Sequence, residues 1–137
     1  MDTAIALSDD AQRTAGILLL TVVAVQSGGL FVLRVLRRRD VTDFQRAFFR
    51  AGHAHAGVLV VLSLVCQLYA DASGLSGAAE QVARSGVPLA AILMPAGFFL
   101  SAAQRGATGP SRWIALLYAG ALALAAGVVT LGIGLLA

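Results

Sequence analysis

Four long apolar segments, joined by short polar connections, limit this chain to few architectures. The segments cover residues 15–36, 44–70, 82–103 and 113–137. A helix of about 20 apolar residues crosses the hydrocarbon core of a bilayer, which is about 30 Å thick, and each segment reaches that length. The sequence therefore predicts an all-α integral membrane protein, with a single four-helix transmembrane domain over residues 1–137.

Charged side chains are too few for the chain to fold as a water-soluble globular protein. They form 12% of the chain, whereas soluble domains average about 25%. A globule of this size could not cover its apolar core with so few polar groups, which excludes an ordinary cytosolic enzyme, a disordered regulator and a disulfide scaffold. Cys66 is the only cysteine, so an intrachain disulfide is excluded as well.

The connections between the apolar segments are short, at residues 37–43, 71–80 and 106–111. Short connections join neighbouring antiparallel helices, so they predict an up-down-up-down bundle. Near the start of the chain, Ser8 followed by Asp9 and Asp10 is typical of a helix N-terminus, because caps and acidic residues favour that end of the helix dipole.

Glycines recur every seven residues in the last segment, at Gly120, Gly127 and Gly134. A stripe of small residues lets two helices approach closely in lipid. It indicates either packing within the bundle or an interface between copies of the chain.

The basic residues are unevenly distributed between the two ends of the predicted bundle. All ten are arginines. Those in or beside the first and third connections are Arg34, Arg37, Arg38, Arg39, Arg46, Arg50, Arg105 and Arg112. The charged residues of the other end are Asp2, Asp9, Asp10, Asp71 and Glu80, with Arg13 and Arg84.

The positive-inside rule then predicts that the arginine-rich end faces the cytoplasm. The expected location is a cell membrane, as a multi-pass protein, with a prokaryotic inner membrane favoured. We interpret the arginines as loop and interface charges beside the lipid bilayer, and we expect no nucleic-acid partner.

One short stretch combines ionisable residues with a membrane segment: Gly52-His53-Ala54-His55-Ala56-Gly57. Its two histidines are the only ones in the chain. An ionisable side chain inside a membrane helix is costly and is a functional candidate by default. The alternative is a pair of interfacial histidines that hydrogen-bond to their neighbours.

Helix geometry restricts what the pair can bind. His53 and His55 point about 200° apart on one helix, because each residue turns by 100°. Chelation of one metal ion from one helix needs a spacing of three or four residues. Two histidines that face opposite ways suit two sites, each shared with a neighbouring copy. A haem with two axial histidines requires one on each face of its ring. A haem between protomers suits this arrangement, and we expect it to be of b-type, although the spacing does not itself define the haem type.

Arginine is a natural partner of carboxylates such as the two propionates of haem. The candidates on the same membrane side as the histidines are Arg46, Arg50, Arg105 and Arg112. The alternative is that these arginines are plain interfacial anchors. The small residues around His53 and His55 likewise leave room for a flat macrocycle or serve ordinary helix packing.

These residues resemble one core module of haem–copper oxidase subunit I, whose twelve helices form three pseudo-symmetric four-helix modules. His53-Ala54-His55 is similar to the His-x-His pair of that family, in which each histidine ligates a different haem. Met94-Pro95 and the run Gly109-Pro110-Ser111-Arg112-Trp113 are similar in spacing to the family's proline and arginine loop. The resemblance covers about half of the chain and implies that Arg112 binds a propionate.

The resemblance has consequences for assembly and activity. One module is a third of that subunit, which implies a homotrimer with a cofactor site between neighbours. The family's copper site needs histidines on a third helix of a module, and residues 82–103 contain none, so oxygen reductase activity is not supported. A bis-histidine haem leaves no open position for a substrate, and the expected role is electron transfer or redox sensing with a redox partner. The equivalent loops of the family face outward, whereas the arginines here predict the inward side.

Three other functions stay open. An open-site haem or copper protein would use only one of the two histidines. A cofactor-free structural or accessory subunit of a membrane complex would suit the small size and the glycine stripe. A transporter is hinted at only by Pro88 and Pro95, which suggest a broken helix.

Overall fold

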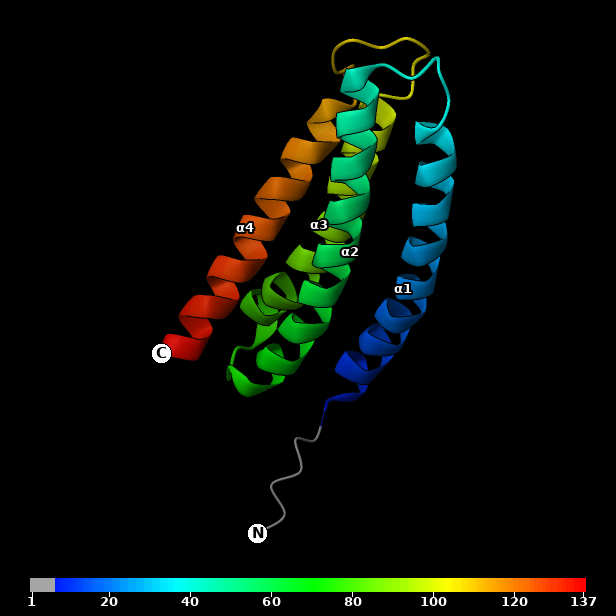
Figure 1. Cartoon of the computed structure of the whole chain (residues 1–137). Coiled ribbons are helices and arrows are strands. Elements are labelled where there is room, and N and C mark those ends of the chain that lie inside the picture. The colour runs from blue at the N-terminus through cyan, green and yellow to red at the C-terminus, as the bar shows by residue number, and fades with distance from the viewer. Residues whose placement is uncertain (1–6) are drawn as a thin grey trace.

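The structure, a computed structural model, describes residues 7–137 and contains four helices that run alternately up and down (Figure 1). The helices are α1 (Asp9–Leu36), α2 (Asp43–Ala72), α3 (Gly77–Ser101) and α4 (Ile114–Leu136). Each is long and apolar enough to cross a membrane. The prediction of an all-helical chain with four candidate spans is therefore confirmed. Asp2, one of the acidic residues in the predicted charge distribution, lies outside the described residues.

Polar caps begin α1 and α2 ahead of the apolar runs that predicted them. Ser8 accepts a hydrogen bond from the Ala11 amide, as its position before two aspartates predicted, and α1 begins at Asp9 instead of residue 15. Thr42 and Gln45 form a reciprocal capping box at the start of α2. These caps satisfy backbone amides that a helix start leaves free.

The interface between α3 and α4 brings the two backbones into contact. A Cβ atom on Gly86 would lie 2.6 Å from the carbonyl oxygen of Ala123, and one on Gly127 would lie 3.0 Å from the Cα of Gly86. Gly120 faces Met94 of α3, and Gly134 faces Leu75 in the connection before α3. The glycine stripe of α4 therefore packs within the chain, which confirms the first of its two interpretations.

The core lies among α2, α3 and α4. Its buried members are Leu59, Cys66, Ala70, Ala83, Val87, Ala90, Met94 and Leu131. Helix α3 contributes half of them and runs without interruption through Pro88 and Pro95. The broken helix hinted at by these prolines is absent from α3.

Helix α1 is attached differently. Within residues 7–137 it packs against α2 alone and stands apart from α3 and α4 (Figure 1). Ala11, Leu18 and Val32 of α1 are buried, and Val25 approaches α2 at Gly57. These positions are seven residues apart, so a single stripe of α1 touches α2 while its other faces stay open. The bundle is consequently not closed between α1 and α3.

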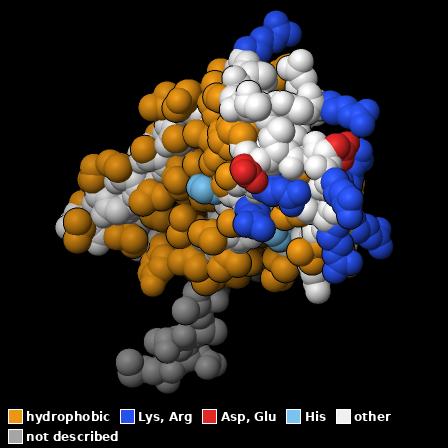
Figure 2. Space-filling view, turned by 45° about the horizontal axis from the view of Figure 1, so that its top comes forward, with side chains coloured by type: hydrophobic (Ala, Val, Ile, Leu, Met, Phe, Trp, Pro, Cys, Tyr) orange, Lys and Arg blue, Asp and Glu red, His pale blue; other side chains and the backbone are white. Residues whose placement is uncertain are grey.

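The first and third connections lie at the same end of the molecule (Figure 1). Figure 2 shows arginine side chains gathered at that end, beside a surface that is otherwise largely hydrophobic. Asp40 in the first connection pairs with Arg38 at 2.8 Å and with Arg105 of the third connection at 3.4 Å. The hydrogen bond from Arg38 holds the pKa of Asp40 below its ordinary value. The structure thus gathers the arginines at one end, as predicted.

Candidate functional site

His53 and His55 lie on different sides of α2. A Cβ atom on Gly29 of α1 would lie 2.9 Å from Nε2 of His53, so the His53 ring occupies the space that this glycine leaves. The His55 ring packs instead against Phe98 of α3, with 4.9 Å between ring centroids. Both histidines are half-buried. The sequence-based expectation that the pair faces two ways is confirmed, and one chain cannot bring both rings to one iron.

His55 is held by its own helix. Its Nδ1 atom lies 2.8 Å from the Ala51 carbonyl oxygen, and a carbonyl can only accept, so Nδ1 carries the proton. The lone pair then resides on Nε2. Histidines that ligate metals are usually oriented by such a bond from the other ring nitrogen. The same bond also fits the alternative in which His55 binds no metal and only hydrogen-bonds to its neighbours.

His53 lines a hollow between α1 and α2 of about 640 Å³, a volume within the range of small-molecule sites. We call it the arginine hollow. Its lining includes Gln26, Gly29, Arg37, Arg46, Arg50 and His53. Within residues 7–137, the structure records no hydrogen bond to the His53 ring. The site therefore combines a free imidazole, apolar walls and guanidinium groups.

The arginines of the hollow differ in their hydrogen-bond partners. Arg46 donates hydrogen bonds to the carbonyl oxygens of Leu36 and, at 3.0 Å, of Arg38, and so caps the end of α1. Arg50 is exposed and, in the part of the chain that the structure describes, makes no hydrogen bond or ion pair. Arg50 is consequently the arginine most available to an anionic group beside His53.

Arg37 completes the hollow and was predicted from the sequence only as a charge of the first connection, not as a residue of the site. It follows directly on the end of α1 and lines the hollow opposite α2. The spacing of Arg46, Arg50 and His53 by four and then three residues places these side chains on one helix face. That signal was present in the sequence, whereas the approach of Arg37 depends on how α1 docks on α2.

Arg105 and Arg112 lie elsewhere on the same end of the molecule. Arg105 is exposed and faces Asp40. The guanidinium carbon of Arg112 lies 5.6 Å from the centroid of the Trp113 ring, where a cation is attracted by the face of the indole. Neither arginine lines the hollow of its own chain, so a role at a shared site would require a neighbouring copy.

A second hollow lies on the other side of α1 from the arginine hollow. It encloses about 330 Å³, and its lining includes Gly28, Phe31, His53, Ala56 and Phe99. We call it the phenylalanine hollow. His53 borders both hollows, so its imidazole can be reached from cavities on both sides of α1.

Among residues 7–137, no group of three or more histidine, cysteine, aspartate and glutamate side chains is placed to hold a metal ion. The lining of the arginine hollow offers one such donor, the imidazole of His53. A single imidazole beside arginines and apolar walls suits a flat, mostly apolar ligand that carries its own negative charges.

No family model matches the chain, and no curated protein and no solved structure matches it either. The resemblance to haem–copper oxidase subunit I therefore stays a prediction carried by short motifs, and function is inferred from the site.

Proposed function

We propose that this chain is a membrane haem-binding protein that resembles one module of haem–copper oxidase subunit I and serves electron transfer or redox sensing. The observation that carries the proposal is the arginine hollow. In it His53, Arg50 and Arg37 border one cavity with apolar walls at the arginine-rich end of the molecule.

The lining of the hollow suits both the apolar macrocycle and the charged propionates of haem. The macrocycle is apolar, and Leu30 and Leu33 of α1 provide apolar walls. The two propionates carry negative charge, and the exposed Arg50 and Arg37 offer hydrogen-bond donors of opposite charge at the polar end. Gly29 leaves the space in which the imidazole of His53 lies. Loading would require the His53 ring to turn away from α1.

The second axial ligand in this proposal is His55 of a neighbouring copy. His53 and His55 of one chain face α1 and α3 respectively, so two chains are needed to place an imidazole on each face of one ring. A closed ring of three copies would then hold three haems, in the manner of three fused modules. Arg105 and Arg112 would join the site from the neighbour.

When bound, the haem would supply one-electron redox chemistry, and its potential would depend on axial ligands and burial. The chain's own task is to hold the iron through imidazole nitrogens and to neutralise the propionates. Cys66 is the only cysteine, so the two-cysteine motif for covalent haem attachment is missing, and a non-covalent b-type haem is proposed.

The test is the visible spectrum of the full chain purified from haem-replete cells, with His53→Ala and His55→Ala beside it. Bis-histidine ligation between copies predicts a Soret band in the parent and its loss in both variants. Ser27→Ala is the matched control, because Ser27 is exposed on α1 and bonds only to the Val23 carbonyl. A parent without a Soret band would contradict the proposal.

The same variants separate the two haem arrangements. If a haem were held by one histidine with an open position, His53→Ala would lose it and His55→Ala would keep it. Only the open form would also bind carbon monoxide readily, because a bis-histidine iron has no vacant position.

A cofactor-free accessory subunit is the second candidate. It is favoured by α1, whose outer apolar side chains are widely exposed, as at Leu19 (59%), Leu20 (75%) and Val23 (61%). Such a face suits contact with a helix of a larger complex as well as with lipid. A larger partner that co-purifies with a colourless chain would favour this candidate.

A further inference from the structure

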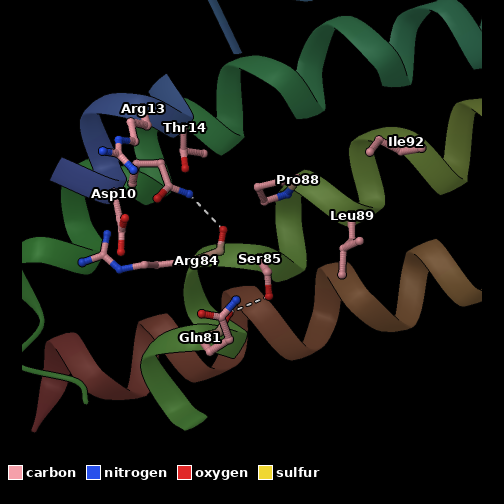
Figure 3. Close-up of a pocket in the computed structure, with 10 residues that line it drawn as sticks. Asp10, Arg13, Thr14, Gln81, Arg84, Ser85, Pro88, Leu89 and Ile92 are labelled. Atoms are coloured by element: carbon pink, nitrogen blue, oxygen red, sulfur yellow. Dashed lines mark hydrogen bonds between the residues drawn. The ribbon is translucent and has the colours of Figure 1, made fainter. Parts of the chain in front are cut away.

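The gap between α1 and α3 is a groove with one polar end. The polar end encloses about 440 Å³ and is lined by Asp10, Arg13, Thr14, Gln67, Arg84 and Ser85, among others. We call it the polar hollow. Figure 3 shows Asp10, Arg13 and Thr14 on α1 and Ser85 and Pro88 on α3. It lies at the end of the molecule opposite to the arginine hollow.

The polar hollow continues into an apolar channel. The next hollow along α1 encloses about 170 Å³ and shares Thr14, Pro88 and Ile92 with the polar hollow. It is walled further by Ile17 and Thr21. We call it the middle hollow. The phenylalanine hollow comes next along the same side of α1. A ligand that enters from the polar end would meet polar groups first and mainly apolar side chains in the middle hollow.

The size of the middle hollow restricts the occupant. A helix with its side chains is about 10 Å across, which a hollow of about 170 Å³ cannot admit. A single extended hydrocarbon chain is slender enough. The groove therefore suits a lipid tail better than a helix of another protein.

The charges of the polar hollow define the head group. Asp10 and Arg13 are exposed and opposite in sign, and neither forms an ion pair within the described residues. Arg84 is already paired with Asp71 and with Glu80, the latter at 2.9 Å. Two arginines thus stand among three carboxylates, so the region does not favour a purely anionic ligand.

Two polar groups on the α2–α3 side define the rest of the lining. Nη1 of Arg84 is buried and has no partner among residues 7–137. Gln67 donates to the Arg84 carbonyl at 2.9 Å, which leaves its own side-chain oxygen as an acceptor. The lining thus offers donors and acceptors together, which matches a head group that carries both signs of charge.

We propose that the groove between α1 and α3 binds a phospholipid with a phosphoethanolamine head group. Its ammonium group lies at Asp10, its phosphate lies at Arg13, and one acyl chain runs through the middle hollow. The proposal does not depend on haem, because the arginine hollow lies on the other side of α1 and at the other end of the molecule.

The experiment is native mass spectrometry of the full chain in detergent after exchange into phosphatidylethanolamine, phosphatidylglycerol or phosphatidylcholine. We expect preferential retention of phosphatidylethanolamine. Arg13→Gln and Asp10→Asn should each lower that retention about tenfold, since each removes one charge-assisted contact. Arg39→Gln, an exposed arginine at the other end, is the matched control and should change nothing.

A third variant tests the channel without altering the charges. Thr21→Phe fills the middle hollow, and Thr21 bonds only to the Ile17 carbonyl of its own helix, so the fold should persist. Loss of retention in Thr21→Phe supports the proposal. Equal or stronger retention of phosphatidylglycerol, unchanged retention in all three variants, or a second copy of the chain in place of lipid would overturn it.

Discussion

The α3–α4 and α1–α2 interfaces use glycine for opposite purposes. Between α3 and α4, Gly86 and Gly127 remove side chains so that two backbones meet. Between α1 and α2, Gly29 leaves a space that the ring of His53 enters. One interface is closed and the other is bordered by hollows on both sides of α1. The comparison indicates that α2, α3 and α4 provide a rigid frame, while α1 forms one wall of the binding sites.

The largest loss of stability is expected when one methyl group is added to the closed interface. Gly86→Ala would place a Cβ 2.6 Å from the Ala123 carbonyl oxygen, and backbone atoms cannot move aside as a side chain can. Overpacking of this kind should cost about 2 to 3 kcal/mol of unfolding free energy. Thermal or denaturant unfolding in detergent measures it.

Gly132→Ala is the matched control for that variant. It lies on α4, the helix that packs against α3, but a Cβ there meets nothing within 4 Å. A helix-interior alanine is favoured over glycine by up to about 1 kcal/mol, so this control should be neutral or stabilising. Similar losses in both variants would show that α3 and α4 are not packed as described.

The same substitution at the open interface should affect the site more than the stability. In Gly29→Ala the new methyl group meets the tip of the His53 ring, which can turn aside, so we expect a cost below about 1 kcal/mol. Haem content and the histidine ring signals in NMR spectra should change. In Gly28→Ala the new Cβ meets nothing within 4 Å, so haem content and the histidine signals should stay unaltered. Equal effects of the two variants would show that Gly29 does not act through its contact with His53.

Helix α1 is fastened at its start by Ser8, whose backbone amide and hydroxyl both donate to Asp71 at 2.9 Å. Because Ser8 also caps the helix, Ser8→Ala should free the first turn and cost about 1 kcal/mol locally. Hydrogen exchange should quicken at the start of α1 and stay unchanged in α3. Faster exchange throughout the chain would mean that α1 stabilises the frame more than its packing indicates.

The smallest effect concerns the loops. The pKa of Asp40 is lowered by its hydrogen bond from Arg38, so the ionised pair is present at neutral pH. It is lost as the pH falls through that lowered pKa. Mobility of residues 37–42, followed by NMR, should therefore increase only in acid. In Asp40→Asn the loop should already be mobile at neutral pH. If neither acid nor this substitution changed the mobility of the loop, the ion pair would not be what orders it.

The sequence predicted the helices well because each apolar run had to be long enough to cross a bilayer. It also predicted the divergence of His53 and His55, since that follows from the turn of a helix alone. It did not predict that α1 packs only on α2. Lipid-facing and protein-facing sides of a membrane helix are both apolar, so hydropathy alone does not show which faces meet. For the same reason Arg37 was missed, because its approach to Arg50 depends on that docking.

The most direct test of haem binding is the number of haems per chain in purified protein, taken from the pyridine haemochrome spectrum and the native mass. We predict one b-type haem per chain in a trimer and loss of the haem in both His53→Ala and His55→Ala. A colourless parent from haem-replete cells, or full haem content in His53→Ala, would contradict the assignment of the arginine hollow as the haem site.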